Sequence, residues 1–112
     1  MALPLNVFKT VTSIASTQTV GIYTAPTGYT GVVLLAQVAN TDGNTQTLNF
    51  AHRRTRVGIA VTTEIVSQFP IQGNDTVTLL QGKLILQSGD ALVLSGSSAR
   101  LKVITSILET LN

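Results

Sequence analysis

The chain has no cysteine, no tryptophan, a single histidine and few charged residues. Without cysteine, disulfides, thiolate metal sites and cysteine nucleophiles are excluded. Charged residues make up 11% of the 112 residues, against roughly 25% in typical soluble domains. Thr, Ser, Asn and Gln supply the polar positions instead. Because neutral polar groups cost less to desolvate than charges, such a surface is typical of a protein that contacts copies of itself.

Long apolar segments are also missing. The most apolar stretch, Gly31 to Ala39, spans about nine residues and includes Gln37, whereas a membrane-spanning helix needs about 20. The segment Met1 to Lys9 has no charged region before an apolar run, so the sequence predicts no secretory signal and no membrane partner. Hydrophobic residues nevertheless reach 44%, which favours a folded chain. The length fits one domain, residues 1–112.

Basic residues and aromatics are too sparse for the usual pattern of a nucleic-acid binder, which is a basic stripe with interleaved aromatics. The net charge is +2 and aromatics are 4% of the chain. The one basic cluster is Arg53, Arg54 and Arg56. Arginine forms bidentate pairs with carboxylates, so one interpretation is a loop that docks on an acidic protein surface. The other is a solvated loop between strands, with a nucleic-acid phosphate contact third.

The residues that could carry chemistry do not form a recognisable constellation in the sequence. A catalytic histidine needs a nucleophile and an orienting carboxylate, and the arginines near His52 would oppose its protonated form. Asp42, Asp75 and Asp90 each lie in a turn with glycine nearby, where we expect them to bond the backbone locally. Calcium loops and glycine-rich phosphate loops are absent from the sequence. The sequence therefore predicts no catalytic residue, no metal and no cofactor, and a protein that is not an enzyme.

Residue choice favours strands, because Thr, Val and Ile recur throughout the chain and suit a pleated sheet. Turn-forming residues arrive at short intervals, as in sandwiches and barrels, and no window keeps a helical apolar period. We predict an all-β fold, a single antiparallel β-sandwich of jelly-roll type with about eight strands. The segments expected to be extended are residues 6–14, 19–24, 31–39, 45–53, 58–69, 76–80, 83–87, 91–94 and 99–108.

One connection between these segments and one of the segments themselves lead to further predictions. Asp42-Gly43, between the third and fourth, tolerates the positive φ angles of a tight hairpin, so the sequence predicts a hairpin there. The strand 31–39 is apolar on both faces, so we expect it to be covered on both, in the centre of a sheet or at a subunit contact. Val32, Leu34 and Val38 are therefore candidates for self-association, together with the closing strand 101–108.

Four stretches carry a resemblance to a known class of proteins: residues 3–10 (LPLNVFKT), 20–33 (VGIYTAPTGYTGVV), 82–90 (GKLILQSGD) and 104–112 (ITSILETLN). In these the chain resembles small virion structural proteins of tailed bacteriophages, particularly contractile-tailed phages of marine cyanobacteria. The resemblance implies a compact β protein that oligomerises and binds the particle surface. It brings no catalytic residues with it.

We therefore expect a capsid decoration (cement) protein, made in the host cytoplasm and carried on the virion surface. The expected partners are the chain itself, as a homotrimer, and the phage major capsid protein or another virion protein. The arginine loop would dock on the shell. Residues 1–8, an extended N-terminal arm that includes Pro4 and Leu5, would add a second contact, because proline lacks the N–H that a sheet ladder needs. The alternatives are a neck, tail or fibre-attachment component, or a receptor- or glycan-binding sandwich with an exposed aromatic platform.

Overall fold

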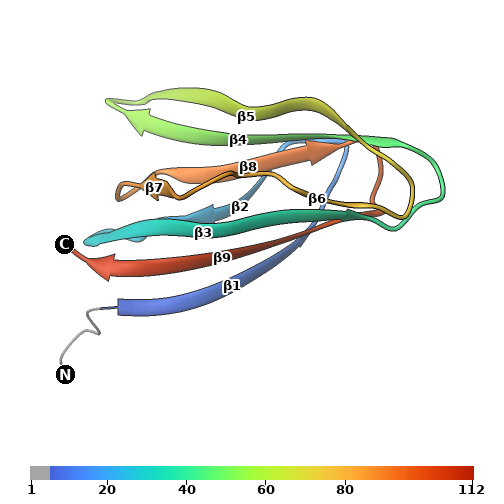
Figure 1. Ribbon diagram of the computed structural model, residues 1–112. Coiled ribbons are helices and arrows are strands. Elements are labelled where there is room, and N and C mark those ends of the chain that lie inside the picture. Colours follow the sequence, from blue (N-terminus) through green and yellow to red (C-terminus); the bar gives the residue numbers. More distant parts are fainter. Residues whose placement is uncertain (1–5) are drawn as a thin grey trace.

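The computed structural model describes residues 6–112, and every regular element in that range is a β-strand (Figure 1). No helix able to cross a membrane occurs among those residues. The nine strands confirm the predicted all-β fold, with the sixth and seventh shorter than expected. Their bounds are β1 Asn6–Ile14, β2 Val20–Thr24, β3 Tyr29–Asn40, β4 Gln46–Arg56, β5 Ile59–Ile71, β6 Thr76–Thr78, β7 Leu84–Leu86, β8 Ala91–Gly96 and β9 Leu101–Leu111.

The strands form two antiparallel sheets that pack face to face (Figure 1). One, here the β3 sheet, has the order β1-β9-β3, with β6 and β7 sharing the place beyond β3. The other, here the β4 sheet, has the order β2-β8-β4-β5. Counting β6 and β7 as one interrupted strand gives two four-stranded sheets between which the chain crosses repeatedly. This is jelly-roll topology, so that prediction is confirmed.

The predicted hairpin at Asp42-Gly43 is wrong, because β3 and β4 belong to different sheets. Residues 41–45 cross from one sheet to the other, and the buried side chain of Asn40 shapes the crossing. Its Nδ2 donates to the carbonyl oxygens of Asn44 and Ile71, each at 2.9 Å, and its Oδ1 accepts from the N–H of Asp42. The Asp-Gly pair therefore serves a longer loop that is organised by an asparagine outside it.

The tight hairpin of the chain lies between β4 and β5 instead. Arg56 pairs with Ile59, and the two residues between them, Val57 and Gly58, have φ angles of 52° and 76°. Two consecutive positive φ angles are the mark of a two-residue hairpin turn. A β-branched residue rarely adopts such an angle, so Val57 does not resemble a turn residue in the sequence.

The core lies between the two sheets and follows the alternation of each strand. On β9, the side chains of Leu101, Val103 and Ile107 point inward, and on β4 Leu48 and Phe50 do the same. Strand β3 occupies a central place, with β9 on one side and β6 and β7 on the other, as its composition predicts. The inner face of β3 packs against the β4 sheet. Its outer face is not covered by any described residue.

Two phenylalanines give a test of this core. Phe50 is fully buried, whereas Phe8 on β1 is 75% exposed. We expect Phe50→Ala to lower the free energy of unfolding by about 3–5 kcal/mol, the usual cost of a large core cavity. Phe8→Ala should change it by about 0.5 kcal/mol or less. Urea unfolding followed by circular dichroism measures both values, and equal losses would contradict the assignment of the core.

Candidate functional site

A buried carboxylate, that of Asp90, gathers the charged side chains of β4. The Asp90 side chain is 0% exposed and lies in the turn between β7 and β8. Arg54 binds both of its oxygens, with Nε 3.0 Å from Oδ1 and Nη2 2.7 Å from Oδ2. His52 Nε2 lies 3.1 Å from Oδ2, and Arg56 Nη1 lies 3.4 Å from Oδ1. One acid from the β7–β8 turn therefore holds three side chains of β4.

The hydrogen bonds from Arg54 hold the pKa of Asp90 far below its usual range. Bonds from His52 and from the backbone N–H of Gln87, at 3.0 Å, act in the same direction. Burial alone would raise that pKa, but the bonds outweigh it. The same contact raises the pKa of Arg54. The carboxylate is therefore charged throughout the physiological pH range.

The three arginines do not form a loop, which corrects the prediction. All of them lie in β4, and Arg56 is its last residue. Arg54 and Arg56 bind Asp90. Arg53 points to the other face, where its Nε donates to Thr62 Oγ1 at 3.4 Å. The prediction failed because the partner of the cluster lies more than 30 residues away in sequence, in a turn whose acid was expected to bond its own backbone alone.

The inner face of the β4–β5 hairpin is open beside this cluster. His52, Arg54 and Arg56 from β4 face Ile59, Val61 and Thr63 from β5 across a groove of about 460 Å³. Ile59 and Val61 are 67% and 58% exposed. One wall of the groove is therefore basic and the other is apolar.

The second surface is the outer face of the β3 sheet. The strand registers place Phe8, Leu108, Val32 and Ile85 in one row across β1, β9, β3 and β7. By alternation along the strands, Lys102 is the one charged side chain among the described strand residues that point to this face. The face is therefore an apolar and neutral polar surface that is four strands wide.

The predicted self-association residues divide between this face and the core. Val32 and Leu34 lie on the outer side of β3, where Leu34 sits at a register shift and is partly exposed. Val38 is fully buried in the domain's own core, so it cannot contact a partner. Pro4 and Leu5 lie outside the described residues.

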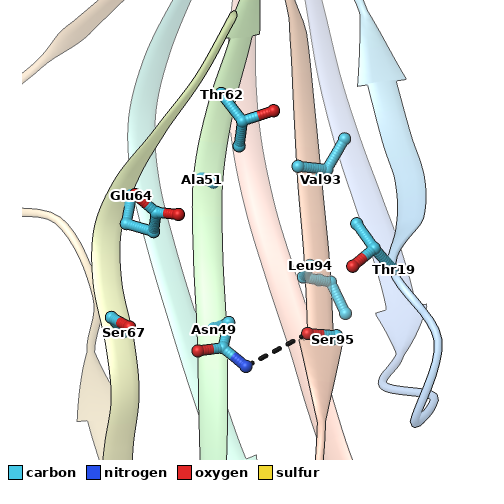
Figure 2. Close-up of a pocket in the computed structure, with 9 residues that line it drawn as sticks. All are labelled: Thr19, Asn49, Ala51, Thr62, Glu64, Ser67, Val93, Leu94 and Ser95. Atoms are coloured by element: carbon cyan, nitrogen blue, oxygen red, sulfur yellow. Dashed lines mark hydrogen bonds between the residues drawn. The ribbon is translucent and has the colours of Figure 1, made fainter.

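A third feature is a shallow hollow of about 220 Å³ on the outer face of the β4 sheet (Figure 2). Its floor includes the small side chain of Ala51, which leaves space between larger neighbours. Asn49 Nδ2 donates to Ser95 Oγ at 3.1 Å along one side. Glu64 is the one carboxylate in its lining, so the hollow does not offer the pair of acids that glycoside hydrolysis uses. Among residues 6–112, no three metal-ligating side chains gather into a site.

A second buried carboxylate, Glu109, joins the two sheets. Tyr23 Oη on β2 donates to its Oε2 at 2.5 Å, and Lys9 Nζ on β1 lies 3.3 Å from the same oxygen. Burial, and then the contact with Glu109, raises the pKa of Tyr23 well above its usual value. Gly31 makes room for this ring, since a Cβ there would lie 3.2 Å from Tyr23 Oη. No local sequence pattern indicates this pair, because its members are 86 residues apart.

The low pKa of Asp90 predicts a specific loss of stability in acid. A carboxylate whose pKa is lower in the folded than in the unfolded protein stabilises the fold at pH values above its unfolded pKa of about 3.9. That stabilisation disappears as the pH falls toward the folded pKa. We expect Asp90→Asn to be less stable at pH 7 by about 1.5–3 kcal/mol, the range for hydrogen bonds to a charged group. Between pH 7 and pH 3 it should then lose less stability than the unsubstituted chain does.

The matched control is Asp75→Asn, at an exposed turn acid whose Oδ1 accepts from the N–H of Thr76. Asparagine keeps that acceptor, so this variant should follow the unsubstituted chain at both pH values. Guanidinium unfolding at pH 7 and pH 3 measures all three proteins. An Asp90→Asn variant with unchanged pH dependence would show that Asp90 has an ordinary pKa.

Comparison with known proteins identified no relative of this chain. No family model matches the chain. No curated protein and no solved structure is detectably similar to it either. What the chain does is therefore inferred from its own surfaces.

Proposed function

We propose that this chain is a structural protein of a phage particle, a capsid decoration protein that binds the shell through the outer face of its β3 sheet. The observation that carries the proposal is the row of Phe8, Leu108, Val32 and Ile85, on a face where Lys102 is the one charged side chain among the described strand residues. Contiguous exposed apolar surface marks interaction sites in soluble proteins. A nearly uncharged face also costs little to desolvate against a partner.

The virion as the place of action is supported by the four stretches that resemble small virion structural proteins. Jelly rolls form viral capsid domains, but they also form lectin and other domains, so the fold alone does not select a function. The proposal of a non-enzymatic role is also supported by this resemblance, which brings no catalytic residues with it. The outer face of the β3 sheet is four strands wide and carries mainly apolar and neutral polar side chains, so it suits binding to another protein surface.

The shell contact is assigned to the apolar face and not to the arginines, because Arg54 and Arg56 already bind Asp90 within the chain. Removing an arginine from a buried carboxylate would cost stability. Arg53 remains available on the other face of β4. Pro4 and Leu5 directly precede β1 in the sequence, and Phe8 of β1 begins the apolar row. Pro4 and Leu5 therefore remain a predicted second contact.

The homotrimer remains a prediction. A closed ring of three copies needs two different complementary surfaces on each copy, whereas a two-fold pair uses one surface twice. Light scattering at micromolar concentration should give about 35 kDa for three chains of 11.8 kDa each. A clean monomer would show that any trimer forms only on the particle.

A charge placed in the apolar row tests the shell contact. We expect Phe8→Glu to weaken binding to undecorated particles tenfold or more, about 1.4 kcal/mol or more, because the carboxylate loses its hydration at the contact. Val57→Glu is the matched control, since it introduces the same charge at a fully exposed valine of the β4–β5 turn. Cosedimentation with particles over a range of protein and salt concentrations measures bound copies.

The outcomes separate the alternatives. Binding of hundreds of copies per particle that is insensitive to salt supports shell decoration by an apolar face, whereas saturation at a dozen or fewer indicates a neck, tail or fibre-attachment component. Loss of binding by Arg53→Ala, with Phe8→Glu unaffected, would move the contact to the basic surface. No binding of the unsubstituted chain would refute the proposed function.

A further inference from the structure

The free edges of the two sheets are not equally protected against pairing with another strand. Edge strands expose unpaired N–H and C=O groups, and proteins usually shorten, interrupt or charge them. Strand β2 has five residues and a register shift. Strands β6 and β7 have three residues each and are separated from one another. Strand β1 carries Lys9, which points inward to Glu109.

Strand β5 differs from these three edges. It has 13 residues, and among the described residues its single partner is β4. The half of β5 nearer Pro70 has the usual protection, with register shifts opposite Phe50 and a positive φ angle at Gln68. Residues 59–63, Ile-Ala-Val-Thr-Thr, have no charge, proline, glycine or register shift. This segment is a regular, unprotected edge.

The hairpin turn determines which backbone groups point outward from that edge. In a two-residue hairpin the residues that flank the turn exchange hydrogen bonds, and every second pair beyond them does the same. Arg56 pairs with Ile59, so Ile59, Val61 and Thr63 bond to β4. The N–H and C=O groups of Ala60 and Thr62 therefore point to the free side.

We propose that a second copy of this chain pairs with this edge, β5 against β5, in an antiparallel two-fold contact centred on Val61. In this register Val61 lies opposite its counterpart, Ile59 lies opposite Thr63, and the outward groups of Ala60 meet those of Thr62. Every facing pair is neutral, so self-pairing brings no like charges opposite one another, which would destabilise it. The edge residues themselves are therefore compatible with their own copy in this register.

The arginines of β4 do not prevent this contact. Each would lie at least three strand spacings of about 4.8 Å from its counterpart, about 14 Å or more in total. Exposed charges are screened over about 8 Å at physiological ionic strength. On the inner face, pairing would also bring the exposed side chains of Ile59 and Val61 beside those of the second copy. The two basic and apolar grooves would then join across the two-fold axis.

The contact is small, and its strength follows from that. Stable interfaces bury more than about 1,000 Å², which two five-residue segments do not reach. The pairing should be weak for free chains and stronger wherever copies are held close together, since proximity raises the effective concentration. It does not depend on the proposed shell contact, because that contact uses the other sheet.

Because the chain has no cysteine, one introduced thiol can report the contact. In the proposed register the two Val61 residues form a non-hydrogen-bonded pair with Cα atoms about 4.5 Å apart, within the disulfide range of about 4.4–6.8 Å. We expect Val61→Cys to form a disulfide-linked dimer under mild oxidation, at an initial rate at least tenfold above that of the control. Non-reducing gels over a concentration series, without particles, measure the rate.

The control is Val57→Cys on the same hairpin. Its two thiols would lie eight residues apart along the paired strands, about 27 Å, so the proposed contact cannot join them. Val57 is 100% exposed and Val61 58% exposed, so random collision would favour the control. Circular dichroism of both reduced variants checks that each has folded.

Three results would overturn the proposal. One is a Val57→Cys dimer that forms as fast as the Val61→Cys dimer, and another is a Val61→Cys chain that stays monomeric at the highest concentration. The third is a Val61→Lys variant that loses particle binding while Val61→Cys forms no dimer, which would assign the edge to a strand of the shell protein. Failure of the shell contact alone would instead appear as a dimer that forms normally in solution and does not sediment with particles.

Discussion

The charged side chains on the inner face of β4 are positioned by one buried carboxylate, that of Asp90, whose main ion pair is with Arg54. A carboxylate without solvent contact needs several donors, and it draws them from β4 and from the N–H of Gln87. The turn between β7 and β8, where the chain passes from the β3 sheet into the β4 sheet, is thereby fastened to β4. The position of Arg54 in the basic wall of the groove follows from this bond. Arg54 and Arg56 thus act first within the fold, and the two proposed contacts use neutral surface.

The two proposed contacts lie on different sheets and use different physics. The outer face of the β3 sheet offers side chains, and its contribution would come from apolar area. The edge of β5 offers backbone groups, so its contribution would come from hydrogen bonds in a fixed register. A molecule with both can bind a surface with one sheet and a neighbour with the other. The small number of charges in the chain is compatible with this division, because neither contact requires opposite charges to meet.

Much of the fold was predictable from the sequence because local patterns determine it. The alternation of β4 and β9 and the turn residues between strands placed nearly every strand within a few residues. Features that depend on distant partners were not predictable. Asn40 converts an apparent hairpin into a crossing loop through the carbonyl of Ile71, and Val57 forms a turn in a conformation that its side chain disfavours. Of the candidate site residues, Val32 and Leu34 lie at the surface and Val38 lies in the core. Arg54 and Arg56 bind Asp90, an acid that no local sequence pattern connects with them.

The place of β9 in the β3 sheet determines the order in which the fold can form. This strand, the last in the described chain, lies between β1 and β3, and its register joins Asn6 to Thr110 (Figure 1). The β3 sheet therefore has no continuous ladder until residues 101–111 have been synthesised. Pairing of segments about 100 residues apart slows folding, because the long loop must close before its contacts form. During that interval β1 and β3 would expose unpaired edges, so the chain's vulnerability to aggregation should be greatest in nascent and truncated forms and fall sharply once β9 inserts.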